Sequence, residues 1–228
     1  MTPARLLGRC VALVALFLLA PLLVVLALGV RLTSPGPALF RQERVGRGGR
    51  AFEMLKFRTM TSTRTRGEPQ ITASGDARVT AFGRLLRASK LDELPELYNI
   101  VRGDMGFVGP RPEVPRYVDV EDPLWQRVLE SAPGLTDPTT LRLRNEEGLV
   151  AQLAALRAGD VEAAYRDDLL PYKLRSSAAY LERQTPWTDL VVLIRTLVAI
   201  VSSPAPPTVD EVLRARDGWR PPGAAAPR

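Results

Sequence analysis

The segment that organises this chain is SKLDELPELYNIVRGDMGFVGPRP, residues 89–112. An adjacent acid pair, Asp92 and Glu93, stands at its start. Hydrophobic side chains then recur at i, i+3, i+4 and i+7, which marks one face of a helix: Leu94, Leu97, Tyr98 and Val101. Because Pro95 needs no backbone N–H in a first helical turn, Asp92 fits the N-cap position. Taken alone, this pattern makes Asp92 a capping residue and Glu93 an acid at the positive end of a helix dipole.

Composition limits the chemistry that the chain can perform. The 228 residues carry 31 Lys+Arg against 25 Asp+Glu, a net charge of +6, which suits an acidic partner such as a nucleotide, a phospholipid surface or nucleic acid. One Cys and no His exclude a disulfide framework, a Cys- or His-rich zinc site and a Ser-His or Cys-His catalytic pair. Catalysis would therefore depend on carboxylates, Lys, Arg or a hard metal ion.

Residues 11–30, VALVALFLLAPLLVVLALGV, carry no charge. A helix of about 20 residues is about 30 Å long, the thickness of a bilayer core. A secretory signal is one interpretation, but the apolar run exceeds the usual length of about 7–15 residues. A spanning helix and a re-entrant helix are the others. Arg5 and Arg9 precede the run, and Arg31 and further arginines follow it. The positive-inside rule therefore places both ends of the run on the cytoplasmic side. Pro21 allows a central kink, and we favour the re-entrant helix.

Two short strands are predicted at residues 38–45 and 51–57, around a Gly-rich turn at residues 46–49. The second strand leads into an alternation that places Lys56 and Arg58 on one face. This pair is either a set of solvated charges on an edge strand or a cationic pair directed at phosphate.

The region between the hairpin and the acid pair begins with residues 61–75, which are polar and aperiodic and predict a mobile loop. An amphipathic helix around residues 79–86, carrying Arg87 at its end, then leads to the acid pair. Residues 133–138, PGLTDP, predict a loop. Three Ala- and Leu-rich or amphipathic segments further along predict helices: 148–158, 161–169 and 172–183.

Three parts follow from these patterns: a membrane re-entrant helix at 1–32, a cytoplasmic catalytic domain at 33–201 and a tail at 202–228. Residues 190–201 are apolar but, at about 12 residues, too short to span, so they pack in the core or lie along the membrane surface. The Pro- and Ala-rich tail is expected to be largely disordered, with only 209–215 helical. The predicted fold class is α+β, mostly helical: one membrane-associated, monotopic catalytic domain with a small β-hairpin.

With these parts in order, the chain resembles the small bacterial sugar-transferase family, the polyprenyl-phosphate phosphoglycosyl transferases. The resemblance covers roughly residues 1–136. It depends on the apolar segment with its central Pro and on SPGPALFRQERVGRGGRAFEMLKFRTM, FGRLLRASKLDELPELYNIVRGDMGFVGPRP and PGLT. Large family members add several membrane spans ahead of this core, so we expect a minimal single-module enzyme. Many relatives continue PGLT with Gly-Trp where this chain has Asp137-Pro138. That departure bears on the sugar and the lipid rather than on the catalytic residues.

The resemblance implies transfer of a sugar-1-phosphate from a UDP-sugar to a polyprenyl (undecaprenyl) phosphate, with release of UMP. Such a reaction is the first membrane step of a surface glycan pathway such as exopolysaccharide synthesis. It places the enzyme at the bacterial inner membrane with its catalytic domain on the cytoplasmic side. The expected partners are the UDP-sugar, the polyprenyl phosphate and the membrane. A homodimer is compatible with the resemblance, and no nucleic acid is expected.

The residues suit this chemistry. Because Asp is ionised well below pH 7, Asp92 needs no base to act as the nucleophile and form an aspartyl-phosphosugar. Asp92 and Glu93 are the expected ligands of Mg²⁺, with Mn²⁺ as an alternative. Phosphate charge would be neutralised by four cations: Lys56, Arg58, Arg87 and Arg111. The alternative function is a non-catalytic basic protein of the membrane surface or of nucleic acid. The aromatic content of 6% and the lack of a recognised nucleic-acid module argue against it.

Overall fold

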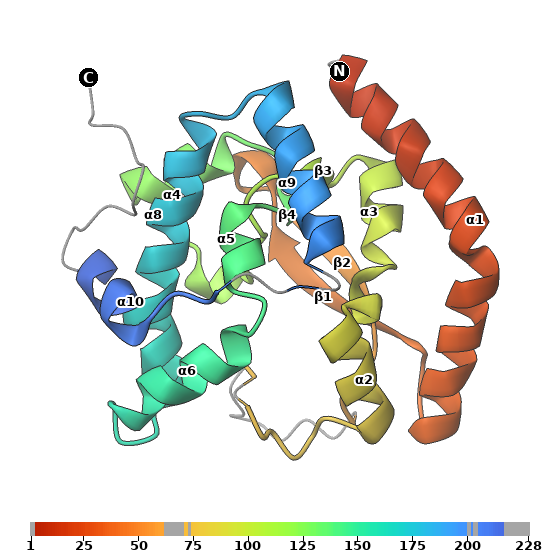
Figure 1. Cartoon of the computed structure of the whole chain (residues 1–228), viewed down its shortest axis with the longest axis horizontal. Coiled ribbons are helices and arrows are strands. Elements are labelled where there is room, and N and C mark those ends of the chain that lie inside the picture. The colour runs from red at the N-terminus through yellow and green to blue at the C-terminus, as the bar shows by residue number, and fades with distance from the viewer. Residues whose placement is uncertain (1–2, 62–70, 73, 200–201, 203–204, 217–228) are drawn as a thin grey trace.

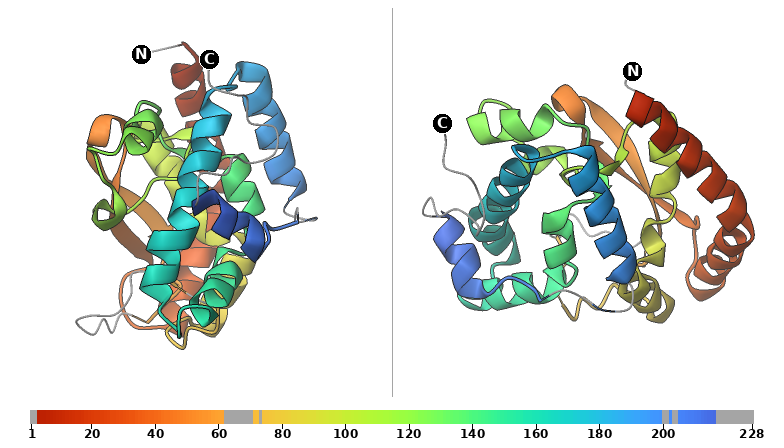
Figure 2. Two further views of the ribbon diagram at one scale, coloured as in Figure 1. Left: turned by 90° about the vertical axis from the view of Figure 1, so that its left-hand side faces the viewer. Right: turned by 45° about the horizontal axis from the view of Figure 1, so that its top comes forward.

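The computed structural model of the chain describes residues 3–61, 71–72, 74–199, 202 and 205–216. Helices dominate, and the described strands form two small two-stranded sheets, which confirms the predicted α+β, mostly helical class. Helix α1 lies along one side of the molecule, and α4, α6, α8 and α10 gather on the opposite side (Figures 1 and 2). The elements, in chain order, are α1 (Pro3–Thr33), β1 (Leu39–Val45), η1 (Arg47–Gly49), β2 (Ala51–Phe57), α2 (Ala81–Ser89), η2 (Leu91–Glu93), α3 (Glu96–Arg102), β3 (Gly106–Val108), η3 (Pro115–Tyr117), α4 (Pro123–Leu129), β4 (Gly134–Thr136), α5 (Pro138–Arg142), α6 (Glu146–Ala155), α7 (Val161–Ala163), η4 (Ala164–Leu169), α8 (Leu170–Leu181), α9 (Pro186–Val198) and α10 (Val209–Arg216).

Helix α1 is continuous and contains Pro21, and it curves along the side of the domain (Figure 1). Its first half packs through buried Ala12 against residues of α3 and β2, and its second half packs through Val30 against residues of α2 and β2. The Arg9 Nε donates a hydrogen bond of 2.7 Å to the Val101 carbonyl oxygen. The outer face is apolar and exposed, with Phe17 at 81%. Both halves of α1 therefore contact the same folded domain.

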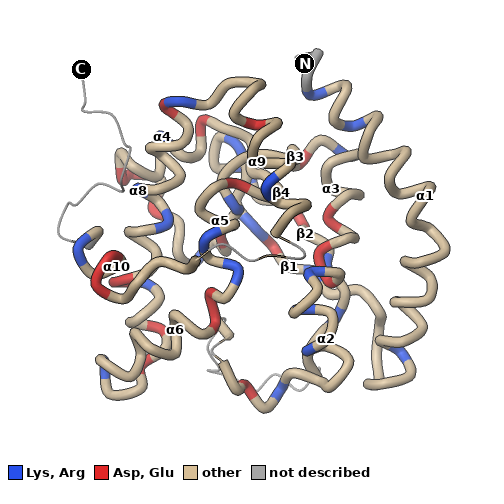
Figure 3. The backbone as a smooth tube through the Cα atoms, in the orientation of Figure 1, with Lys and Arg blue, Asp and Glu red and all other residues tan. Residues whose placement is uncertain are grey.

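Among the described residues, α1 is the one helix that is long and apolar enough to cross a membrane. Its charges lie only near its two ends (Figure 3). Length and surface thus suit insertion into a bilayer. The re-entrant topology stays a prediction.

Strands β1 and β2 form the predicted hairpin, with Leu39 opposite Phe57 and Val45 opposite Ala51. The connecting turn needs positive φ at two successive residues, 66° at Gly48 and 74° at Gly49, a conformation that glycine adopts without a steric penalty. This register places Lys56 one residue before the end of β2.

The acid-pair segment differs from its prediction in one respect. Helix α2 ends at Ser89, the following Lys90, with a φ of 58°, turns the chain into the 3₁₀ turn η2, and α3 begins only at Glu96. The expectation that Asp92 caps the helix is wrong, because Pro95 holds the N-cap position and Asp92 lies within η2. The apolar face marked by the sequence is buried only in part: Tyr98 is 48% exposed, whereas Glu96, which lies outside that pattern, is fully buried.

Residues 133–138 were predicted to be a loop, but Gly134–Thr136 form strand β4, which pairs in parallel with β3. The two backbones approach very closely: a Cβ on Gly134 would lie 2.2 Å from the Gly109 backbone nitrogen. Glycine at both positions permits this approach, and a short strand defined by a distant partner leaves little pattern in the sequence. The pairing fixes the start of the loop that carries Arg111.

The helical side contains the largest core cluster, with fully buried Leu153, Leu169 and Val212. Residues 161–181 form successive helical segments, and Ala164–Leu169 have π-helical hydrogen bonding. Val212 belongs to α10, so the helix expected at 209–215 packs into this core rather than lying in a disordered tail. The remainder of that tail, residues 217–228, and most of the loop expected at 61–75 lie outside the described residues.

Helix α9 covers most of the apolar segment 190–201 and packs in the core on one side, which is the first of the two alternatives raised for it, and contact with the membrane stays a prediction. Val192, 5% exposed, and Ala199, 2% exposed, pack with Leu141 and Tyr180. The opposite side presents an exposed apolar stripe at helical spacing: Trp187, Leu190, Ile194 and Leu197.

Candidate active site

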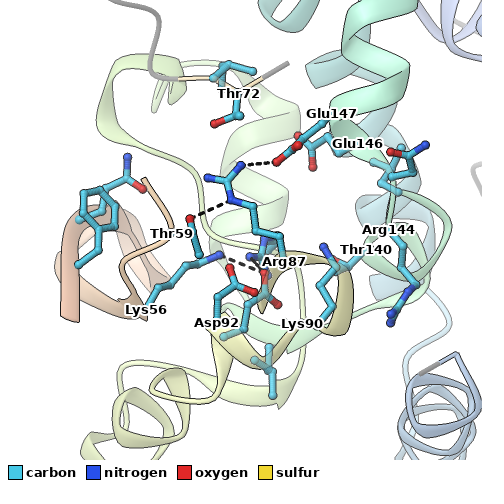
Figure 4. A pocket seen from close by; sticks show the side chains of 18 of the residues that line it. Lys56, Thr59, Thr72, Arg87, Lys90, Asp92, Thr140, Arg144, Glu146 and Glu147 are labelled. Atoms are coloured by element: carbon cyan, nitrogen blue, oxygen red, sulfur yellow. Dashed lines mark hydrogen bonds and ion pairs between the residues drawn. The ribbon is translucent and has the colours of Figure 1, made fainter. Parts of the chain in front are cut away.

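The acid pair lies at the edge of a large cavity with a volume of about 1240 Å³. Turn η2 places Asp92 there, 7% exposed, and its Oδ1 atom has no hydrogen-bond partner among the described residues. In Figure 4 the Asp92 side chain stands beside Lys56 and Arg87, and Glu147 lies across the cavity. A buried carboxylate oxygen without a partner is rare, because desolvation costs free energy that no hydrogen bond offsets. The geometry leaves this atom available to a ligand.

Glu93 is engaged by two cations. Its Oε1 accepts a hydrogen bond of 3.1 Å from the Lys56 ammonium, which projects from β2. The same oxygen accepts from the Arg111 guanidinium, on the loop after β3. The structure thus brings together predicted site residues from three separate segments.

A third carboxylate, that of Glu96, lies close to Lys56 and Arg111 and was not singled out from the sequence. It is fully buried, and its Oε1 lies 3.4 Å from the Lys56 nitrogen and 3.8 Å from an Arg111 nitrogen. Its position three residues after Glu93 puts both acids on the same side of the segment, which is the signal that could have identified it. Lys56 and Arg111 therefore share two carboxylates.

Burial and neighbouring charges shift the pKa values of the three acids in different directions. Burial, reinforced by the negative charge of Glu93, raises the pKa of Asp92, while Lys56 opposes the shift. Burial also raises the pKa of Glu96. For Glu93, burial is outweighed by the charges of Arg111 and Lys56, which hold its pKa well below the usual range. Glu93 is consequently a fixed negative charge at neutral pH.

The other two predicted cations are placed differently. Arg87, in the last turn of α2, donates 2.9 Å to the Thr59 hydroxyl and pairs with Glu147 of α6 across the cavity (Figure 4). Arg58 also lines the cavity, but its Nη2 donates 2.7 Å to the Ser34 carbonyl oxygen at the end of α1. Arg58 is thus oriented by Ser34, directly after α1, and Arg87 by Glu147 on the other side of the cavity.

Two further cations, Lys90 and Arg144, line the cavity and were absent from the sequence prediction. Neither forms a side-chain ion pair or hydrogen bond with any of the described residues. Lys90 stands next to the acid pair, and its charge lowers the pKa of Asp92. Arg144 faces it from the segment between α5 and α6 (Figure 4). Cations without carboxylate partners in a cavity suit an anionic ligand.

The Arg111 loop is held from two sides. The Arg44 guanidinium, on β1, donates 2.9 Å to the Pro112 carbonyl oxygen, and the Val45 N–H donates 2.9 Å to the Glu113 carbonyl oxygen. The Glu113 carboxylate, 5% exposed, accepts from the Lys173 ammonium of α8. Strand β1 and helix α8 therefore fix the loop that presents Arg111.

The residues present fit a hard divalent cation. Asp92 and Glu93 are adjacent oxygen donors, and the unpartnered Asp92 Oδ1 is free to coordinate. No cluster of three or more metal-binding side chains occurs in the described ranges. A two-carboxylate site of this kind matches Mg²⁺, which is commonly bound through one or two carboxylates plus substrate phosphates and water.

Comparisons with known proteins identify the family of the chain. A protein-family model described as bacterial sugar transferase matches residues 2–203. A UDP-glucose:undecaprenyl-phosphate glucose-1-phosphate transferase of Caulobacter vibrioides is 37% identical over 82% of this chain and 65% of its own length. A UDP-N-acetylgalactosamine-undecaprenyl-phosphate N-acetylgalactosaminephosphotransferase of Aeromonas hydrophila is 31% identical over 84% of this chain and 42% of its own. The exopolysaccharide production protein ExoY of Rhizobium meliloti is 29% identical over 83% of this chain and 81% of its own length.

The chain thus spans less than two thirds of the length of the first two of these relatives. The family match nevertheless covers α1, the hairpin, the acid pair and all the cavity-lining helices from α2 to α9. On that match, and with the acid pair and its cations assembled in one cavity, the chain belongs to the bacterial sugar transferase family.

Proposed function

We propose that this chain transfers a sugar-1-phosphate from a UDP-sugar to a polyprenyl phosphate, with release of UMP. The observation that carries the proposal is the unpartnered Asp92 oxygen in a cavity that is also lined by cations. The names of the relatives supply the substrate classes, a UDP-sugar and undecaprenyl phosphate. The resulting sugar diphospholipid would begin assembly of a surface glycan.

The reaction proceeds in two displacements. The Asp92 carboxylate oxygen attacks the phosphorus that bears the sugar, and the bond from that phosphorus to the bridging oxygen breaks, so UMP leaves with the electron pair. A phosphate oxygen of the lipid then attacks the aspartyl-phosphosugar, which restores the Asp92 carboxylate and forms the diphosphate link. Each step retains the transferred sugar-phosphate, and neither needs an oxidant or reductant.

The cations make the first displacement feasible. A carboxylate and a diphosphate repel each other unless positive charge lies between them. Lys56 and Arg111 stand at the acid pair, while Arg87 and Lys90 flank it along the cavity. Mg²⁺ held by Asp92 and Glu93 would add charge neutralisation on the phosphates.

The membrane is the proposed site of action, with the catalytic domain on the cytoplasmic side. Because Arg9 and Ala12 near the start of α1 contact the catalytic domain, as Val30 near its end does, both ends of α1 are expected on that side. Single cysteines at Thr2 and Ser34, in a variant with Cys10 replaced, test this with a membrane-impermeant thiol reagent on intact cells. Labelling at Thr2 from outside would indicate a spanning helix.

The decisive test is Asp92→Asn, which keeps the size of the side chain and removes its charge. We expect loss of turnover and of the UMP burst that wild type gives without lipid, in a protein that melts at a temperature no lower than that of wild type, because the ionised Asp92 is disfavoured by burial. Exposed Asp210 on α10 provides the control, and Asp210→Asn should retain both activities. Intact-protein mass spectrometry should show a sugar-phosphate adduct on wild type that hydroxylamine removes. Near-normal activity of Asp92→Asn would refute the nucleophile assignment.

A further inference from the structure

A second hollow, of about 450 Å³, lies between the C-terminal half of α1 and the start of β1. We refer to it as the α1–β1 groove. Its α1 wall consists of Val24, Ala27, Leu28 and Arg31, spaced i, i+3, i+4 and i+7, which is a single helix face. Opposite them lie Leu39 and its neighbours, reached through the short connection from α1 to β1 (Figure 1). Val24 is 59% exposed and Leu28 is 55% exposed, so the apolar wall is accessible.

The groove shares part of its lining with the catalytic cavity. Pro37, Leu39 and Arg41 line both the groove and the cavity that contains Asp92. The start of β1 therefore borders both the groove beside the apolar surface of α1 and the cavity of the acid pair. A molecule whose apolar part lies in the groove would therefore hold its polar end next to the residues that line the catalytic cavity.

The charges of the groove select the kind of molecule. Among the described residues, its only charged side chains are two arginines, Arg31 and Arg41. Arg31 forms no ion pair within the described ranges, and Arg41 pairs only with Glu53, at 3.0 Å, where both side chains are about half exposed or more. Such an exposed pair is weak, so Arg41 can exchange its partner. An apolar wall with two available cations complements a long hydrocarbon chain that ends in a phosphate.

We propose that the α1–β1 groove is the entry and binding site of the polyprenyl phosphate acceptor. Its first isoprene units lie against Val24, Ala27 and Leu28, and its phosphate passes Arg31 and Arg41 on the way to the aspartyl-phosphosugar. This inference rests on the proposed function, since it assigns a site to that reaction's second substrate. A bulk phospholipid shares the chemistry of chain and phosphate, but the lining that the groove shares with the catalytic cavity favours the acceptor.

The test compares two neighbouring substitutions, Val24→Trp and Val25→Trp, in nanodiscs. Val25 is 62% exposed and on the same helix but does not line the groove, so it is a matched control. Val24→Trp should leave the UMP burst from UDP-sugar intact. It should slow transfer to undecaprenyl phosphate roughly tenfold or more, a factor that corresponds to about 1.4 kcal/mol of lost binding. Val25→Trp should stay within about twofold of wild type, a range typical of a surface change. Arg31 lines the groove and not the catalytic cavity, so Arg31→Gln should raise KM for the lipid and leave the burst unchanged.

A second readout does not depend on turnover. A benzophenone amino acid at position 24 should crosslink to undecaprenyl phosphate, and one at position 25 should not. Equal effects at the two positions, or equal loss of burst and transfer in Val24→Trp, would overturn the proposal. Competition of the crosslink by phosphatidylglycerol as effective as that by undecaprenyl phosphate would also overturn it. A wild type without any burst would instead count against the covalent mechanism, and the crosslinking result would still decide the groove.

Discussion

Glu113→Gln is expected to destabilise the protein far more than a typical substitution. The Glu113 carboxylate accepts 2.6 Å from the Tyr165 hydroxyl, accepts from Lys173 and lies 3.6 Å from an Arg44 nitrogen. Glutamine leaves the Lys173 ammonium, 9% exposed, with Glu146 at 3.2 Å as its remaining counter-charge. Breaking a buried pair in this way costs about 3–5 kcal/mol. In a chain of this length, that lowers the melting temperature by roughly 6–20 °C.

The assay is thermal unfolding of detergent-purified protein, followed by circular dichroism. Glu130 offers a matched control, because its pair with Arg127 is exposed, at 69% and 51%. Glu130→Gln should cost less than about 1 kcal/mol. Adding Lys173→Met to Glu113→Gln should recover part of the lost stability, since it removes the buried charge that has lost its closest partner. If Glu113→Gln costs no more than Glu130→Gln, the buried cluster does not support the Arg111 loop as inferred.

The pH dependence gives an independent check. Burial alone would raise the pKa of Glu113, but the charges of Lys173 and Arg44 lower it below its ordinary value of 4.5. A group whose folded-state pKa is depressed contributes stability above its unfolded pKa and loses it as the pH falls through the folded value. The difference in stability between wild type and Glu113→Gln should therefore be full at neutral pH and shrink below about pH 4.5.

Three other predictions concern activity and membrane contact. Excess EDTA should abolish UMP release and Mg²⁺ should restore it better than Zn²⁺, because the site has oxygen donors only; full activity in EDTA would exclude a metal role. Lys56→Met should shift the acid limb of the rate profile to higher pH, since Lys56 lowers the pKa of the Asp92 nucleophile, which must be ionised; an unshifted limb would contradict this. Ile194→Glu should weaken vesicle binding by removing apolar area from the exposed stripe of α9, whereas Arg195→Gln should not; co-flotation with vesicles measures both.

Local patterns in the sequence predicted the elements whose causes are local. The uncharged run at residues 11–30 indicated a long apolar helix. A helix forms all its backbone hydrogen bonds within its own segment, so this element needs no partner from elsewhere in the chain. Alternation around a Gly-rich turn similarly predicted the β1–β2 hairpin, whose strands are neighbours in the chain. Residue chemistry without His narrowed the catalytic candidates to carboxylates, Lys and Arg.

Contacts between distant segments decided the rest. Only the tertiary structure brings Lys56, Glu96 and Arg111 together and turns Glu96 inward, because the partners come from β2, α3 and the loop after β3. A helical pattern scored by hydrophobicity alone assigns such a charged residue to the solvent face. Strand β4 was missed for the same reason, since three residues become a strand only through pairing with β3. Sequence thus determined which groups are available and which short-range elements they occupy. The folded chain determined which charges meet, because a buried charge is stable only where distant segments supply its counter-charge.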